Sequence, residues 1–243
     1  MLTTPHAPAG QLGRGLYLPA EAARLAQVDA DRVRRWVRGY DHTNPRTGER
    51  KHSPPLFPRE RSDSSGRLLL TFLDLIEVCF VREFLKHGVS IHLVRKVQAE
   101  AQREFRVAHP FCVKRFETDG ETIVERVRDA EGVERIFDRG VTADRLMAEV
   151  FNPLLRTLDY EGIAQEAQRW WPLGKAVPVV VDPERSSGEA IVSRAHVPTR
   201  VLFAAHAAGE PDERIAKWYG VSVEEVRAAI EFEQSRTPAR PAA

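Results

Sequence analysis

Apolar positions within residues 16–40 recur at helical spacing and predict two short helices joined by a tight turn. The first helix is expected to begin at about Pro19, because proline has no amide proton to leave unpaired at a helix start, and to end at about Gln27. Asp29 can accept the free amide groups at the start of the second helix. One face of the second helix is expected to be buried through Val33, Trp36, Val37 and Tyr40.

Arginines occupy much of the remaining surface of the second helix. With the apolar face turned to the core, Arg35 and Arg38 point outward, and Arg32 and Arg34 lie on the flanks. A short helix that is held by an apolar face and presents guanidinium groups is suited to reading the major groove of DNA. The alternative is an ordinary helical hairpin with a solvated basic face. Spacing and charge together favour DNA binding through these four arginines.

The next stretch, residues 41–66, is rich in proline, serine, glycine and charge and has few apolar residues. It suits a wing, meaning two short strands whose tip lies along the phosphate backbone, with residues 68–70 as the closing second strand. The competing interpretation is a mobile surface loop. The candidate backbone contacts of the wing are Arg50, Lys51, Arg59 and Arg61.

Two longer helices are predicted to complete this first unit. Thr71 is placed to cap a strongly apolar helix that ends at Gly88, and Ser90 starts a second helix that extends to about residue 105. The predicted winged helix-turn-helix unit therefore spans residues 16–108, after a flexible arm at residues 1–15.

Residues 109–175 change in character. Residues 113–138 predict a three-stranded meander, with one turn at Asp119-Gly120 and a second at residues 129–132. A helix over residues 142–151 is expected to stop or kink at Asn152-Pro153, and residues 154–171 to continue as helix or loop. We expect this part to act as a spacer or a dimer platform.

The last unit, residues 176–234, predicts two short strands at 177–181 and 190–192, followed by helices over 198–208, 212–219 and 222–234. Ser222 and Glu225 form a capping box for the last helix. That helix carries several glutamates, which a phosphate backbone would repel, so we expect the unit to contact protein. The glutamates are Glu224, Glu225, Glu231 and Glu233. Residues 235–243 are expected to form a flexible tail.

Charge is divided unevenly along the chain. The net charge is +1 over 243 residues, but residues 1–70 hold twelve Arg and Lys against seven Asp and Glu. A basic amino-terminal part followed by a more acidic remainder favours polyanion binding at one end and a different task at the other. Nothing resembles a signal peptide or a membrane span, and the two cysteines are far apart, so a reduced cytoplasmic protein is expected. No spacing indicates a metal site, a cofactor or a catalytic constellation, and we expect no enzyme activity.

The amino-terminal hundred residues resemble the winged helix-turn-helix of MerR-like regulators. The resemblance rests on the opening from Tyr17 through Glu21 to Arg24-Leu25 and on the later Arg34-Arg35-Trp36. It implies DNA binding through the second helix and a wing, by a homodimer.

The carboxy-terminal unit is similar to a small domain-of-unknown-function family common in bacterial type II antitoxins. The residues that carry this similarity are Val179 to Pro183, Gly188 to Val192, Val197-Pro198, and Gly209 through Ile215 to Tyr219. Together the two resemblances imply a VapB-like antitoxin that binds operator DNA and neutralises a PIN-like ribonuclease toxin. The alternative is a MerR-like transcriptional regulator whose carboxy-terminal part senses a ligand or serves dimerisation. The expected fold is mainly α with small β elements, in the α+β class.

Overall fold

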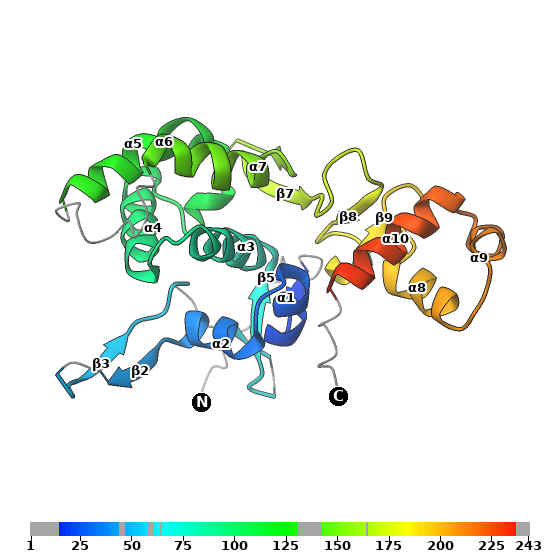
Figure 1. Cartoon of the computed structure of the whole chain (residues 1–243), viewed down its shortest axis with the longest axis horizontal. Helices are drawn as coiled ribbons and strands as arrows, with labels where there is room; N and C mark the ends of the chain where they lie inside the picture. Colours follow the sequence, from blue (N-terminus) through cyan, green and yellow to red (C-terminus); the bar gives the residue numbers. More distant parts are fainter. Residues whose placement is uncertain are drawn as a thin grey trace, which may run out of the picture.

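The structure is a computed structural model that describes residues 15–43, 47–57, 61–63, 65–130, 142–163 and 165–236. It is α+β, as expected, with helices and small antiparallel sheets arranged along an elongated body (Figure 1). Within the part of the chain that is described, no helix is long and apolar enough to cross a membrane.

The predicted helix-turn-helix is present at the amino-terminal end of the described chain. Strand β1 (Leu16–Tyr17) leads into α1 (Pro19–Ala26) and α2 (Ala30–Arg38). The Asp29 side chain accepts hydrogen bonds from the backbone amides of Asp31 and Arg32, both at 3.0 Å, and so caps α2 as predicted. The buried face of α2 consists of Val33, Trp36 and Val37, whereas Tyr40 lies beyond the helix in a strand.

Two strands after α2 form a separate antiparallel hairpin, which projects at the lower left of Figure 1. They are β2 (Tyr40–Thr43) and β3 (Arg50–Ser53), and we call the pair the wing hairpin. The prediction that residues 68–70 supply its second strand is wrong. Strand β5 (Leu68–Thr71) instead pairs with β1 and with β4 (Arg61–Ser62), because its alternating leucines are buried in the core.

The two predicted long helices are confirmed as α3 (Phe72–Lys86) and α4 (Ile91–Phe105). Thr71 and Asp74 form a capping box at the start of α3, and Ser90 Oγ accepts a hydrogen bond from Leu93 N at 3.2 Å. Helix α3 is buried over most of its length and forms the centre of the larger core.

The predicted meander at residues 113–138 is wrong in its first part. A short 3₁₀ turn (Pro110–Cys112) leads into one continuous helix, α5 (Arg115–Ala130), which runs through the expected turn at Asp119-Gly120. A Cβ on Gly120 would lie 2.7 Å from the ring of Phe116, so glycine here permits close helix packing and makes no turn. The predicted strand at residues 133–138 lies outside the described residues.

A helical stretch follows as α6 (Ala143–Leu146), a π-helical turn (Met147–Phe151) and α7 (Asn152–Leu155). The expected kink therefore takes the form of a π turn, and the helix passes Pro153 before it stops. The expected helix or loop beyond residue 154 is instead mostly sheet. Its first two strands are β6 (Leu158–Glu161) and β7 (Glu166–Trp170).

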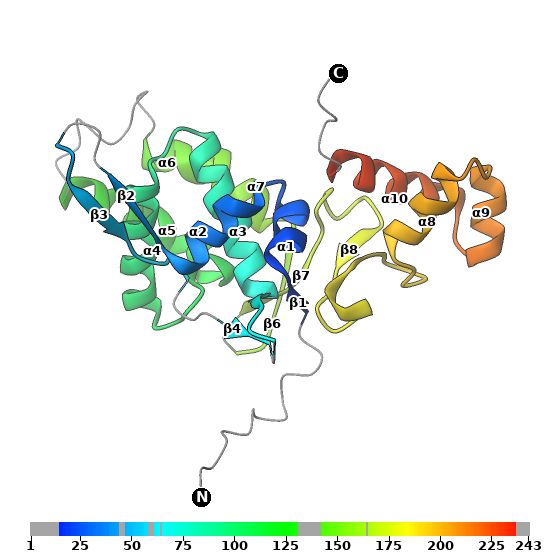
Figure 2. The same ribbon diagram turned by 90° about the horizontal axis from the view of Figure 1, so that it is seen from below.

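The carboxy-terminal unit continues the same sheet, whose strand order is β6-β7-β8-β9. Its elements are β8 (Val179–Val181), a short 3₁₀ turn (Ser186–Gly188), β9 (Ala190–Val192), α8 (Thr199–Ala207), α9 (Asp212–Tyr219) and α10 (Val223–Arg236). The Ser222–Glu225 capping box is confirmed. Both views show the end of α10 beside α1 (Figures 1 and 2). Ser235 and Arg236, predicted as tail, belong to α10, and residues 237–243 lie outside the described residues.

One large core joins the amino-terminal unit, the middle helices and the four-stranded sheet. Five phenylalanine rings meet in it: Phe80, Phe84, Phe111, Phe116 and Phe151. A second, smaller cluster lies inside the carboxy-terminal helices around Leu202, Ile215 and Val226. Since Phe232 of α10 belongs to the larger core, the last helix ties the carboxy-terminal unit to the rest.

Candidate nucleic-acid interface

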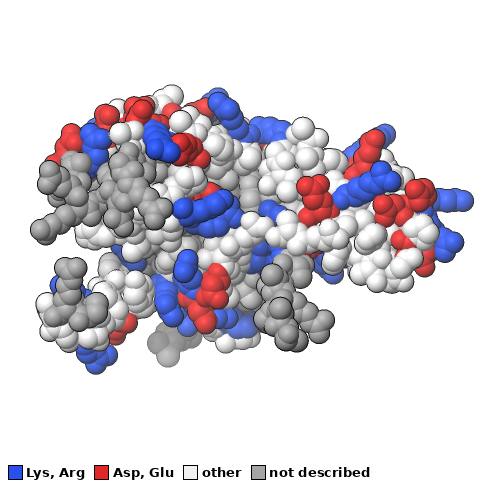
Figure 3. Space-filling model, viewed as in Figure 1, with Lys and Arg blue, Asp and Glu red and all other residues white. Residues whose placement is uncertain are grey.

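The exposed side of α2 presents all four arginines that the sequence singled out. Arg32, Arg34, Arg35 and Arg38 are exposed, while Trp36 on the opposite face retains only 4% of its accessible surface. Arg34 pairs with Asp31 one turn earlier, so part of the charge of the helix is balanced locally. Figure 3 shows Lys and Arg side chains mixed with acidic ones over this part of the molecule.

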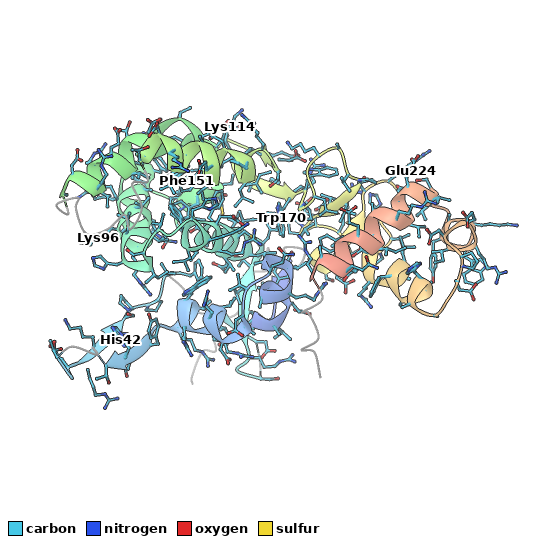
Figure 4. The ribbon with its side chains drawn as sticks, viewed as in Figure 1. His42, Lys96, Lys114, Phe151, Trp170 and Glu224 are labelled. Atoms are coloured by element: carbon cyan, nitrogen blue, oxygen red, sulfur yellow. The ribbon has the colours of Figure 1, made fainter. Side chains whose placement is uncertain are left out.

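The wing hairpin carries two of its four predicted basic contacts. In the antiparallel register Arg50 lies opposite Thr43 and Lys51 opposite His42, whose position is labelled in Figure 4. Both basic side chains are exposed. His52 contacts the Asp41 carboxylate at 2.7 Å, and this hydrogen bond lowers the pKa of Asp41.

The other two predicted contacts are not brought to the wing hairpin. Arg61 belongs to β4, whose partner is β5, so its backbone lies in a different sheet from Arg50 and Lys51. Arg59 lies outside the described residues. The predicted wing therefore divides into a projecting hairpin and a separate strand next to the core.

Three features hold the base of the wing hairpin. The amide of Leu56 donates to the carbonyl of Trp36 at 2.7 Å, which ties the chain after β3 to α2. Gly39 has φ +74°, and a Cβ there would lie 2.6 Å from the Ser53 carbonyl oxygen. Arg95 on α4 donates a hydrogen bond to the carbonyl of Pro54. Sequence reasoning did not find Arg95, because nothing in the chain pattern indicates that α4 reaches the hairpin.

A cavity of about 500 Å³ lies between the helix-turn-helix and the end of α3. Its polar lining includes Asp29, Arg32, Arg82 and Lys86, and Trp36 forms part of an apolar wall. The Arg82 guanidinium is already engaged, because it donates to the Ala26 carbonyl at 2.8 Å. The cavity is therefore cationic in part, with one guanidinium committed to the fold.

The predicted acidic face of α10 is smaller than the sequence suggested. Glu225 is only 6% exposed because it closes the capping box, and Glu233 is only 7% exposed. Glu224, labelled in Figure 4, and Glu231 are exposed as expected. Large exposed apolar side chains are found instead on α9, where Trp218 keeps 57% and Tyr219 keeps 37% of their accessible surface.

The buried Glu233 connects the two ends of the chain. Its carboxylate accepts a hydrogen bond from Arg24 of α1 at 2.8 Å and another from Thr199 of α8 at 2.5 Å. A second connection is made by the Tyr17 hydroxyl, which donates to the Gly188 carbonyl at 2.9 Å. The helix-turn-helix is thus bonded directly to the carboxy-terminal unit.

The described residues contain no group of three or more His, Cys, Asp or Glu side chains that could hold a metal ion. Both Cys79 and Cys112 are free and buried, and burial raises the pKa of each thiol.

Comparison with known proteins gives a partial match to one family. Residues 179–232 match the family model described as "Protein of unknown function (DUF433)". The chain is 25% identical over 240 residues to "Uncharacterized protein Rv2308" of Mycobacterium tuberculosis (strain ATCC 25618 / H37Rv), with 94% of both chains covered. The crystal structure of Rv2018 from Mycobacterium tuberculosis superposes with a TM-score of 0.67 at 18% identity, covering 88% of this chain and 96% of that one. The chain therefore shares its fold with Rv2018 and carries a DUF433 match in its carboxy-terminal unit.

Proposed function

We propose that this chain binds operator DNA and represses transcription of its own operon. The observation that carries the proposal is the arrangement of α2, which presents four exposed arginines opposite a buried Val33, Trp36 and Val37 face. A helix fixed in this way can enter the major groove without losing its own support. The projecting wing hairpin next to it is suited to contact the phosphate backbone.

Within this proposal the two groups of basic residues have different tasks. Arg35 and Arg38 face outward from α2, and together with Arg32 and Arg34 beside them they would contact bases and phosphates. Arg50 and Lys51 would contact the backbone from the wing hairpin. Binding by a homodimer would place two such helices in successive major grooves of a palindromic operator.

We further propose that the chain is the antitoxin of a type II system and neutralises a PIN-like ribonuclease toxin. The similarity of the carboxy-terminal unit to antitoxin-associated domains supports this. So does the exposure of Trp218 and Tyr219, since aromatic side chains are enriched among the residues that dominate protein–protein binding. Glu224 and Glu231 add negative charge to the same unit and could engage a basic surface on a nuclease.

The test of DNA binding is the double variant Arg35→Ala/Arg38→Ala, measured on a duplex from the region upstream of the gene. Each lost contact to a base or phosphate is expected to cost about 1–3 kcal/mol, and each lost phosphate contact to lower the salt slope by about one. Lys114→Met removes one exposed charge elsewhere and serves as the control. Unchanged affinity and unchanged salt slope in the double variant would contradict the assignment.

The test of the antitoxin role is co-purification of the tagged chain with the products of neighbouring genes. Recovery of a small nuclease that is lost with Trp218→Ala, while promoter binding remains, would support it. A promoter shift without a bound nuclease would favour the MerR-like regulator instead. The cavity beside Arg32 is the observation that supports that second candidate, because it offers a small ligand a place next to the DNA-reading helix.

A further inference from the structure

The wing hairpin lacks the support that most short strands have. It is a two-stranded sheet of its own, and most of its side chains are exposed. An isolated two-stranded hairpin is marginally stable in water, so its direction depends on contacts at its base. A DNA contact made by Arg50 or Lys51 can be no better ordered than that base.

One set of base contacts joins the hairpin to α2 alone. Gly39 and Ser53 lie against each other where the two strands meet, and Leu56 N donates to Trp36 O at 2.7 Å. These contacts bring the two ends of the hairpin together. They do not by themselves fix the direction in which the hairpin projects, because α2 lies at only one side of the base.

Arg95 supplies the contact on the other side. It reaches from α4 to the Pro54 carbonyl, directly after β3, and Figure 1 shows α4 above this end of the hairpin. The side chain is half-buried, and its Nη2 is buried without a hydrogen-bond partner among the described residues. Burial also lowers the pKa of Arg95. A partly desolvated guanidinium that binds a carbonyl adds little surface charge, which points to a positional role.

We propose that Arg95 is a positioning residue that fixes the direction of the wing hairpin relative to the body of the protein. Contacts of Arg50 and Lys51 with DNA then depend on Arg95, although Arg95 itself touches no DNA. This inference rests on the proposed DNA-binding function and adds to it a residue on a different helix, 41 positions beyond its partner Pro54.

The length of the hairpin makes its direction important. Arg50 lies three residues from Ser53 at the base, which at about 3.3 Å per residue gives a lever of roughly 10 Å. A change of about 10° at the base then moves Arg50 by about 2 Å. Hydrogen bonds tolerate only a few tenths of an ångström, so such a movement breaks a phosphate contact made by Arg50.

The first experiment is a double-mutant cycle on the intact chain and the upstream duplex. Arg95→Met keeps the apolar stem and removes the donor, and Arg50→Gln/Lys51→Gln neutralises the hairpin. Arg95→Met is expected to weaken binding about tenfold alone and less than about twofold in the neutralised background, because residues that act through one contact are not additive. Equal losses in both backgrounds, or no loss in either, would overturn the proposal.

Two further variants serve as controls for Arg95→Met. Lys114→Met removes a charge far from the hairpin, as Figure 4 shows, and is expected to change affinity less than about twofold. Arg95→Lys keeps a charged donor and is expected to recover most of the affinity. An equal loss from Lys114→Met, or no recovery with lysine, would contradict the positional role. If Arg95→Met does not fold, Arg95→Leu, which also removes the donor, takes its place in the cycle.

The second experiment needs no DNA and therefore tests Arg95 separately from the proposed function. Hydrogen exchange of the β2 and β3 amides is expected to be at least about fivefold faster in Arg95→Met, with the amides of α3 unchanged. Unchanged exchange in the hairpin would overturn the proposal. A wild-type chain that fails to bind the duplex would instead remove the proposed function, and the exchange result would still decide the role of Arg95.

Discussion

Glu77 makes the stability of this chain depend on pH, with a sign that follows from its burial. Its carboxyl group is fully buried on α3, where it accepts hydrogen bonds from Gln98 Nε2 at 2.6 Å and from Phe111 N at 3.1 Å. Burial raises the pKa of Glu77 from 4.5 to about 8, although both hydrogen bonds lower it and the Asp74 carboxylate adds to the rise. The folded chain therefore holds a proton on Glu77 at neutral pH.

The size of the effect follows from the two pKa values. An acid with a raised pKa in the folded state contributes its full stability below the pKa of the unfolded chain, and this is lost as the pH rises to the folded value. One pKa unit corresponds to 1.36 kcal/mol. A rise of the Glu77 pKa from 4.5 to about 8 therefore lowers the free energy of unfolding by about 2–3 kcal/mol between pH 5 and pH 7, and by about 1 kcal/mol more by pH 8.

Glu77→Gln isolates this contribution, because glutamine has nearly the same shape and does not titrate. The Gln98 amide can rotate to present its carbonyl to the new amide, so both hydrogen bonds can be kept. The free energy of unfolding is measured in urea at pH 5, 6, 7 and 8. The difference between the variant and the wild type is expected to change by about 2–3 kcal/mol in favour of the variant between pH 5 and pH 7. The exposed Glu224→Gln is the control. Parallel stability curves for wild type and Glu77→Gln would refute the reasoning.

Two further predictions concern the connection between the ends of the chain. Gly188→Ala places a Cβ 2.4 Å from the Tyr17 hydroxyl at φ +82° and is expected to lower the free energy of unfolding, measured by thermal unfolding, by about 2–4 kcal/mol. The control Gly209→Ala, with φ +90° and open space, should lower it by only about 1 kcal/mol. Equal losses in the two variants would contradict the steric argument. Glu233→Ala is expected to lower the free energy of unfolding by about 2–3 kcal/mol and Arg24→Ala by less, with a coupling energy of about 1 kcal/mol in the double variant. Strictly additive losses would show that the 2.8 Å ion pair between Arg24 and Glu233 contributes nothing.

Local signals in the sequence determined four of the helix starts correctly. Asp29, Thr71, Ser90 and Ser222 each occupy the position just before a helix and accept backbone amides there. Such caps act within four residues, and so the chain pattern alone contains the information. The apolar spacing around Trp36 likewise predicted which face of α2 is buried, and by exclusion which arginines are exposed.

Longer-range packing decided the middle of the chain. Asp119-Gly120 is a strong hairpin signal on its own. In the structure, Phe116 and Met147 leave no room for a Cβ at position 120, so the glycine is there because it allows α5 to pack closely. The strand β6 was missed because its pairing with β7 and the continuation of the sheet into β8 depend on residues far along the chain. Local propensity is weak compared with such contacts.

The sequence by itself determined the helix-turn-helix, the outward arginines and the α+β class, because these depend on periodicity and capping over short distances. Only the tertiary structure decided that Arg61 leaves the wing hairpin and that Arg95 joins it. It also decided that Glu233 leaves the acidic face to bind Arg24. Each of these is a contact between residues far apart in the chain, and the burial and hydrogen bonding that select it exist only after the elements have packed.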